Sequence, residues 1–577
     1  PTRTRVPPSA TPIPPTLSPT SPPTAFPESD LSLRIDAQTL IENGDIVRPY
    51  IGIQGAPVDM QNDYEAQLWK NLGLRADTLI SLFNDENGPY WGGMLVQRAA
   101  DAPALWIRVR DDLNLWLDPT DFDAYTRQIS ERLGIGPEEL IIGIGYMPRA
   151  LAYIPPCETG GGACEPPGYD WSYRSPRDLE EWKAVVTKAA ELLCERGYCK
   201  PHATPPRFML FHEAESFFLG YRENLTDWGR LADYAALYVA TQESIQSALG
   251  DAVIYLSGTA VYSGEWRDKI GGYESPLAIE RIMEEIKRSY PDAEISGLAY
   301  QVYRFGGDDL LFGQGGIGYG GQYLRQQLAY YGFDPNVPIA ILGWNGSVYN
   351  DEHRSEVVEP IPGEAPEQYE LRRKERIRDL VDQESGFLAY NLLDLANPGG
   401  EKAVNEATYY TWQLDGNDVE KCLSNFLHPS IVSTKNSGTW SGEGCFTPPS
   451  ELECPRAGYV VFEQFRRFSE MVFVGSDIVE DEPLLQLAAA IDDTGHAQIM
   501  VAHRDGAGIP SALLEVAGLQ PATTYQVRAS HVESQLDLCA SLAAHQTEQA
   551  TTDDQGVLRV FLPAIPLPVL FVELTRQ

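Results

Sequence analysis

The chain has 577 residues, too many for one compact domain, so we expect a large domain plus a smaller one. Hydrophobic residues make up 43% of the chain, enough to bury substantial cores. The 82 acidic residues outnumber the 44 basic ones, giving a net charge of −38. Such a surface repels nucleic acid and anionic lipid and argues against both as partners. A solvated, salt-tolerant surface explains the acidity most simply.

The N-terminal segment, residues 1–28, consists mainly of Pro, Thr and Ser. This composition predicts a disordered linker of the kind that often tethers a folded domain to a cell surface. Because the sequence does not begin with Met, we expect it to start after a cleaved secretion signal. No stretch approaches the ~20 apolar residues of a transmembrane helix, so we expect no membrane span.

Short apolar strands and amphipathic helices alternate from about residue 48 to 420, after a strand-like segment at 29–47 that we expect to join the C-terminal domain. Ser175-Pro176 and Ser275-Pro276 are typical helix starts, with Ser as the cap. This alternation predicts a (β/α)8 TIM barrel. The rival, a doubly wound open sheet, lacks a Gly-rich dinucleotide turn. The expected strands are Tyr50–Gln54, Leu105–Val109, Leu140–Ile144, Phe208–Phe211, Ala252–Leu256, Ile295–Tyr300, Ile339–Leu342 and Ala407–Trp412.

The pattern changes after a Cys-containing connecting loop at 421–454. Residues 455–577 show short alternating strands, which predict a C-terminal β-sandwich. The expected strands are Tyr459–Phe462, Gln498–Ala502, Thr524–Ala529, Leu558–Phe561 and Val569–Leu574.

Eight cysteines are present, and two pairs are close in sequence, Cys157 with Cys164 and Cys194 with Cys199. Close pairs without Cys-x2-Cys spacing or nearby His favour disulfides over a metal site. We therefore expect local pairing, an extracellular or cell-surface location, and neither a metal nor a cofactor. The four later cysteines should pair among themselves, in an order that spacing leaves open: Cys422, Cys445, Cys454 and Cys539.

Two strand ends carry the candidate chemistry, because barrel enzymes place catalytic groups at the C-terminal ends of strands. Glu213 directly follows the fourth strand, near the rings of Phe211, Phe217 and Phe218. Desolvation by those rings would raise the pKa of Glu213 and suit it to general acid catalysis. The alternative is a carboxylate that only caps the following helix.

The strand ends resemble glycoside hydrolase family 39, the family of β-xylosidases and α-L-iduronidase. In that family the fourth strand typically ends Trp-Asn-Glu-Pro-Asn, which corresponds here to 211–215 and puts the acid/base on Glu213, flanked by His212 and Glu215. The seventh strand typically ends Thr-Glu-Trp-Asn, which corresponds here to 342–345 and includes Trp344 and Asn345. The resemblance implies a retaining (β/α)8 glycosidase acting on an oligo- or polysaccharide.

The chain departs from that family where the nucleophile should stand, because the position is Gly343. Retaining enzymes need two carboxyl groups about 5–5.5 Å apart. Three explanations remain open: a catalytically inactive barrel that binds glycans, an active enzyme with a relocated carboxylate, or an engineered or erroneous glycine. The candidates for a relocated carboxylate are Asp351, Glu352 and Glu215, and inversion would then be one outcome.

Other residues fit a sugar cleft. Four aromatic residues lie at or just past expected strand ends and could stack on sugar rings, or simply cover the barrel: Tyr300, Tyr303, Trp344 and Trp412. Arg108 and Arg110 alternate along the expected second strand and would share one face. If that face lines the barrel, either could bind a carboxylate or hydroxyl. The two function hypotheses are a glycoside hydrolase and a non-catalytic glycan-binding or cell-surface structural protein.

Overall fold

The structure is a computed structural model. It describes residues 26–41, 50–54, 63–72, 77–84, 93–99, 104–136, 139–144, 147–153, 174–199, 206–211, 228–262, 278–305, 319–347, 361–396, 404–410, 432–433, 454–480, 482–535 and 539–577. In parts of some strands the structure describes the backbone but not the side chains.

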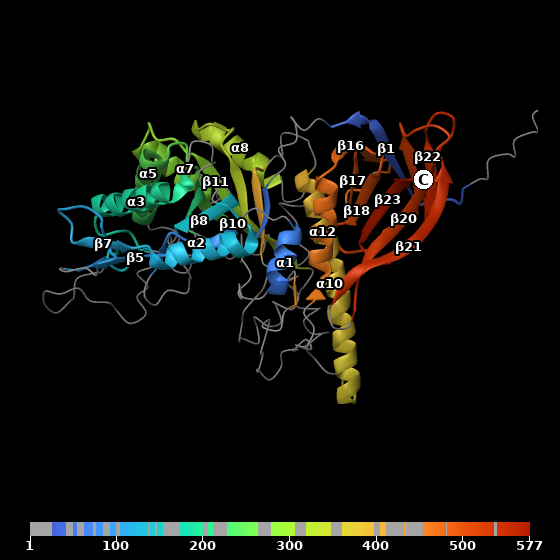
Figure 1. Cartoon of the computed structure of the whole chain (residues 1–577), viewed down its shortest axis with the longest axis horizontal. Coiled ribbons are helices and arrows are strands. Elements are labelled where there is room, and N and C mark those ends of the chain that lie inside the picture. Colours follow the sequence, from blue (N-terminus) through green and yellow to red (C-terminus); the bar gives the residue numbers. More distant parts are fainter. Residues whose placement is uncertain are drawn as a thin grey trace, which may run out of the picture.

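Eight parallel strands form the first domain, in the order β2-β13-β12-β11-β10-β9-β8-β3. The end strands β2 and β3 contact each other, so the sheet curls into a nearly closed barrel (Figure 1). The prediction of a (β/α)8 barrel is confirmed. The strands are β2 (Tyr50–Gln54), β3 (Asp77–Ser81), β8 (Leu140–Ile144), β9 (Arg207–Leu210), β10 (Ile254–Tyr262), β11 (Gly297–Phe305), β12 (Ile339–Ser347) and β13 (Glu406–Tyr410).

One expected barrel strand, Leu105–Val109, is wrong. That stretch holds only β6 (Ile107–Arg108), the edge of a four-stranded sheet in the order β4-β5-β7-β6. The second barrel strand is instead β3, whose sequence DTLIS mixes polar and apolar residues. The other strands of the small sheet are β4 (Phe83–Asn84), β5 (Met94–Arg98) and β7 (Leu115–Asp118).

Alternation along the strands divides the barrel core into two layers. One small cluster fills the space enclosed by the strands, and the opposite faces pack under the surrounding helices. The inner cluster is Ile141, Met209, Tyr255, Ala299, Ala340 and Leu342. The helices of the first domain are α1 (Asp63–Leu72), α2 (Thr120–Leu133), α3 (Leu179–Leu193), α5 (Trp228–Leu249), α7 (Ala278–Ser289), α8 (Tyr319–Tyr331) and α10 (Pro366–Ala396).

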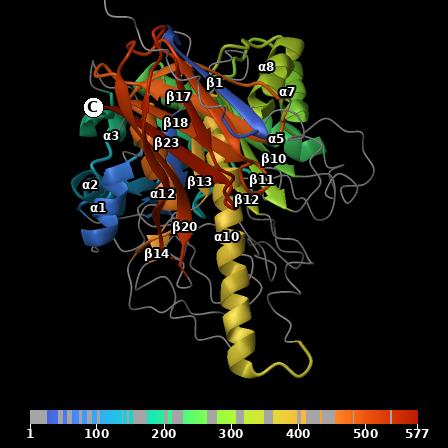
Figure 2. The same ribbon diagram turned by 90° about the vertical axis from the view of Figure 1, so that its right-hand side faces the viewer.

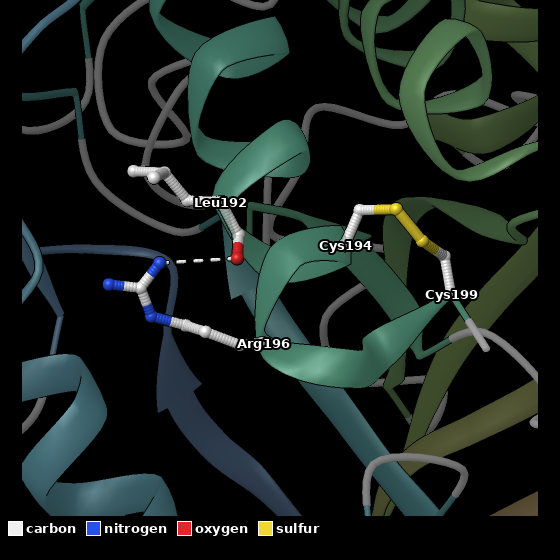
Figure 3. The surroundings of a disulfide bond; sticks show 4 residues. All are labelled: Leu192, Cys194, Arg196 and Cys199. Carbon is white, nitrogen blue, oxygen red and sulfur yellow. Dashed lines mark hydrogen bonds between the residues drawn. A yellow bond between two sulfur atoms is a disulfide. The ribbon is translucent and has the colours of Figure 1, made fainter.

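Helix α3 begins later than its Ser-Pro signal suggests. Asp178 is its N-cap, and its carboxylate accepts a hydrogen bond from the Glu180 amide, so the expected cap at Ser175 is wrong. The helix ends in a π-helical turn, Cys194–Tyr198, closed by a disulfide between Cys194 and Cys199 (Figure 3). In the same turn, Arg196 donates to the Leu192 carbonyl at 3.2 Å. The disulfide expected from the spacing is therefore confirmed. The expected Cys157–Cys164 pair lies outside the described residues.

The second domain is a nine-stranded sheet in the order β21-β20-β23-β18-β17-β16-β1-β19-β22. Its edges meet, because the Gln546 side chain in β21 donates to the Phe561 carbonyl in β22 at 3.1 Å. The sheet thus folds over its own apolar core as a sandwich. Its strands are β1 (Leu31–Leu40), β16 (Val472–Ile478), β17 (Leu485–Ile491), β18 (Ala497–His503), β19 (Ala512–Ala517), β20 (Thr524–Ser534), β21 (Ala540–Thr551), β22 (Leu558–Leu562) and β23 (Val569–Arg576).

The expected strand Tyr459–Phe462 is wrong, because this segment belongs to helix α12 (Ala457–Ser469). Its β-prone residues are buried as part of a helix that packs against α10 and the sandwich. Helix α10 runs between the barrel and the sandwich (Figures 1 and 2) and contacts β17, β18 and β20. Between α10 and α12, a short ladder pairs β14 (Val432–Ser433) with β15 (Cys454–Pro455). Within the described part of the chain, no helix is long and apolar enough to cross a membrane.

Candidate active site

The parallel barrel strands bring their C-terminal ends to one side of the molecule. Strand β9 ends at Leu210, three positions before Glu213 in the sequence. Gly343 lies within β12, and β13 ends at Tyr410, two residues before Trp412. Leu210, Gly343 and Tyr410 therefore lie toward the same end of the barrel. Glu213 and Trp412 themselves lie outside the described residues.

Phe211 turns the chain at the end of β9. Its backbone is left-handed, with φ 51°, which bulky side chains rarely adopt. Its amide donates to the Ile144 carbonyl of β8 at 3.0 Å, and its buried ring lies 6.4 Å from the Tyr234 ring of α5. Strain of this kind persists only where the surroundings hold it, and it gathers at functional sites.

Gly343 is the extra residue of a β-bulge. Between Ile341 and Trp344, β12 has one more residue than the facing part of β11. Between Leu342 and Trp344, it has one more residue than β13. Both neighbouring strands therefore place the irregularity at Gly343. Bulges are frequent beside active sites, and glycine often marks them.

Tyr300 does not belong to a sugar cleft, and that expectation is wrong. Its side chain is 1% exposed and packs in the core outside the sheet, because the neighbouring Ala299 takes the inward position. Burial is the main cause that raises the pKa of the Tyr300 hydroxyl, and the nearby Asp394 adds to it. A ring buried under the helices cannot stack on a sugar.

Arg108 and Arg110 do not lie on a barrel strand. Arg108 ends β6, which belongs to the small four-stranded sheet, and Arg110 follows two residues later. The Arg108 guanidinium lies over the Trp116 ring, 5.1 Å from its centroid. Arg110 forms an ion pair with Asp112 at 2.6 Å, and its hydrogen bonds lower the pKa of that carboxylate. Both arginine side chains are exposed, so their expected place on the barrel wall is wrong.

For three other candidates the structure describes the backbone, and their side chains lie outside the described part. Tyr303 in β11 pairs with Asn345 in β12, and Trp344 pairs with Val302 one step earlier. The register thus brings Tyr303 and Asn345 side by side. Four further candidates lie outside the described residues: His212, Glu215, Asp351 and Glu352.

A buried charged cluster that the sequence did not predict lies at the opposite end of the barrel. Arg207 and Glu406, the first residues of β9 and β13, form an ion pair at 2.8 Å. The Tyr255 hydroxyl donates to the same carboxylate oxygen at 2.7 Å. Burial raises the pKa of Glu406, while Arg207 and Tyr255 act against that shift. The signal was a charged residue at the start of each apolar strand, and this location indicates a role in stability.

Solved structures with a similar fold include three glycoside hydrolases. The GH39 enzyme from Xanthomonas axonopodis pv. citri matches with a TM-score of 0.57 and 13% identity, over 96% of this chain and 98% of the other. A monomeric β-xylosidase from Caulobacter crescentus CB15 gives 0.55 and 13%, over 94% and 99%. An α-L-arabinofuranosidase from Thermotoga maritima gives 0.51 and 11%, over 95% and 100%. By sequence, no family profile and no curated protein matches the chain. At these identities the likeness shows a glycosidase-type fold.

Proposed function

We propose that the chain is a secreted glycoside hydrolase of the family 39 type, with Glu213 as the general acid/base. The observation that carries the proposal is the position of Glu213, which follows the strained end of β9 in a barrel of glycosidase type. Barrel glycosidases hold their proton donor at the C-terminal ends of the strands, and this supports the assignment of that role to Glu213. The substrate is an O-linked oligo- or polysaccharide.

The missing nucleophile is the point on which the proposal depends. Glycine within a strand often marks a bulge, as Gly343 does here, and we therefore treat the glycine as native. The second carboxyl group then has to come from Asp351, Glu352 or Glu215. Tyr303 and Asn345, adjacent in the sheet, are proposed to contact the sugar, together with His212, Trp344 and Trp412.

A second candidate function is a glycan-binding or cell-surface structural protein, and the glycine at position 343 favours it. For either function, the Cys194–Cys199 disulfide supports an oxidising, extracellular location. Residues 1–28 would serve as the tether to the cell surface.

The test compares the wild type with Glu213→Gln and Gly343→Glu on aryl glycosides and polysaccharides. Aryl β-xylosides and α-L-arabinofuranosides come first, because two similar structures carry those names. We expect the wild type to hydrolyse at least one substrate and Glu213→Gln to abolish this. Loss of activity in Asp351→Asn, Glu352→Gln or Glu215→Gln would then identify the second carboxyl group.

Other outcomes separate the alternatives. A wild type that is inert but gains activity with azide, or orders of magnitude in rate with Gly343→Glu, would reveal a lost nucleophile. An inert wild type that retains oligosaccharide, less so after Trp344→Ala, would be a binding protein. If all three proteins are inert and bind no glycan, the carbohydrate function is wrong.

A further inference from the structure

The Tyr234 hydroxyl links two neighbouring barrel strands, at the end of β9 and within β10. Tyr234 lies in α5 and is fully buried. Its hydroxyl is within hydrogen-bonding distance of two carbonyl oxygens, 3.0 Å from Leu210 in β9 and 2.7 Å from Ser257 in β10. The ladder between these strands ends at the pair Leu210–Leu256, so the hydroxyl holds them together where their own pairing stops.

Tyr234 contacts the chain where it leaves β9, at Leu210. The next residue, Phe211, is left-handed, and its ring packs against the Tyr234 ring. Its amide is fixed to Ile144 of β8. Beyond Ser257, β10 also carries an irregularity relative to β11. Tyr234 thus contacts both the backbone of Leu210 and the side chain of Phe211, the last described residues before position 213.

We propose that Tyr234 is a positioning residue for Glu213, an inference that rests on the proposed function. The hydroxyl fixes the Leu210 carbonyl, and the ring supports the left-handed turn at Phe211. Together they fix the backbone at Leu210 and Phe211, the point from which the chain continues to Glu213. Displacing a catalytic group by about 1 Å can cost on the order of 100-fold in rate, so we expect a tether three residues upstream, at Leu210, to affect catalysis.

Tyr238 provides a matched control. It lies one helical turn further along α5 and is equally buried. Its hydroxyl donates to the Ile254 carbonyl at 3.1 Å and accepts from the Ser296 amide at 3.2 Å. Ile254 begins β10, so these contacts lie at the N-terminal end of the strand, three residues before Ser257. Tyr→Phe at either position removes one buried hydroxyl from the same helix.

The experiment compares the wild type with Tyr234→Phe and Tyr238→Phe by two measurements. Amide hydrogen exchange is followed in peptides covering residues 206–215, and kcat, KM and the pH profile are measured on an aryl glycoside. We expect Tyr234→Phe to speed exchange in this segment and to lower kcat about 10-fold or more, with KM changed less than about 3-fold. The limb of the pH profile assigned to Glu213 should also move. Tyr238→Phe should leave kcat and the exchange rates in residues 206–215 within about 2-fold of wild type, and it should leave the pH profile unchanged. This should hold even if Tyr238→Phe lowers the melting temperature as much as Tyr234→Phe does.

Three results would overturn the inference: unchanged exchange in Tyr234→Phe, faster exchange with unchanged kcat and pH profile, or equal losses in both variants. A wild type inert on every glycoside would refute the proposed function, and with it the catalytic role of Tyr234. The exchange measurement needs no substrate, so it decides separately whether Tyr234 holds the end of β9.

Discussion

Gly386 of α10 lies directly against Pro568 of the C-terminal sheet. A Cβ atom at position 386 would collide with the Pro568 ring and come within 2.6 Å of the His503 carbonyl oxygen. The two domains therefore pack closely at Gly386, where the absence of a side chain lets α10 approach the sandwich.

Gly386→Ala should destabilise the protein by about 1–3 kcal/mol, because the His503 backbone cannot move aside as a flexible side chain could. Thermal unfolding measures the loss. Gly475→Ala is the control, since its Cβ would meet Thr39 at 3.4 Å, an ordinary contact. The control should be neutral or stabilising by up to about 1 kcal/mol. Equal melting temperatures for the two variants would contradict the tight contact.

Asp382 should make the same interface sensitive to pH. Burial raises its pKa to about 6, while the nearby Ser534 and the charge of Arg378 act against that shift. An unfolded chain releases this proton near 3.8, so stability falls as the pH rises from 3.8 to about 6 and then levels. Asp382→Asn should therefore gain up to about 3 kcal/mol over wild type at pH 7 and nothing below pH ~4.

Unfolding of both proteins across this range measures the difference. Asp379→Asn is the control, because that carboxylate is half exposed and pairs with Arg378. It should show no such pH-dependent gain. A constant difference between wild type and Asp382→Asn at all pH values would mean that Asp382 does not titrate in this interval.

The sequence predicts the barrel well where strands are continuous apolar runs. Leu140–Ile144 is such a run, and the structure has β8 at those residues. Strand β3 escaped prediction because Asp77, Thr78 and Ser81 interrupt its apolar pattern. Helix α12 was mistaken for a strand because its Tyr-Val-Val-Phe run is β-prone, whereas its packing against α10 decides its conformation.

The candidate site was harder to predict than the fold. Inward and outward positions alternate along a strand, so Tyr300 is placed wrongly unless the register is known. The bulge at Gly343 exists only in the pairing with β11 and β13, which no local pattern reveals. Tyr234 is ordinary as a helical residue, and only the tertiary structure brings its hydroxyl to β9 and β10.

The Cys194–Cys199 disulfide should be found by mass spectrometry of an unreduced digest. The loop it closes is short, so replacing both cysteines by Ala should cost only about 2 kcal/mol in the chain-entropy estimate. The protein should therefore still fold without this bond. A free thiol at Cys194 in protein from an oxidising host would contradict both the bond and the argument for secretion.

The Arg207–Glu406 pair should behave as a buried ion pair with a stability role. Glu406→Gln removes the charge that compensates Arg207 inside the barrel, and it should cost about 3–5 kcal/mol. Replacing both residues together, as Arg207→Met with Glu406→Leu, should recover most of that loss, because no isolated charge is then buried.

The exposed pair of Arg110 and Asp112 is the control, and Arg110→Met should change stability little. Denaturant unfolding of the wild type and these three variants measures the differences. Because the pair lies at the N-terminal ends of the strands, any glycosidase activity should survive in the double variant. A double variant less stable than Glu406→Gln would show that the pair contributes more than mutual compensation of charge.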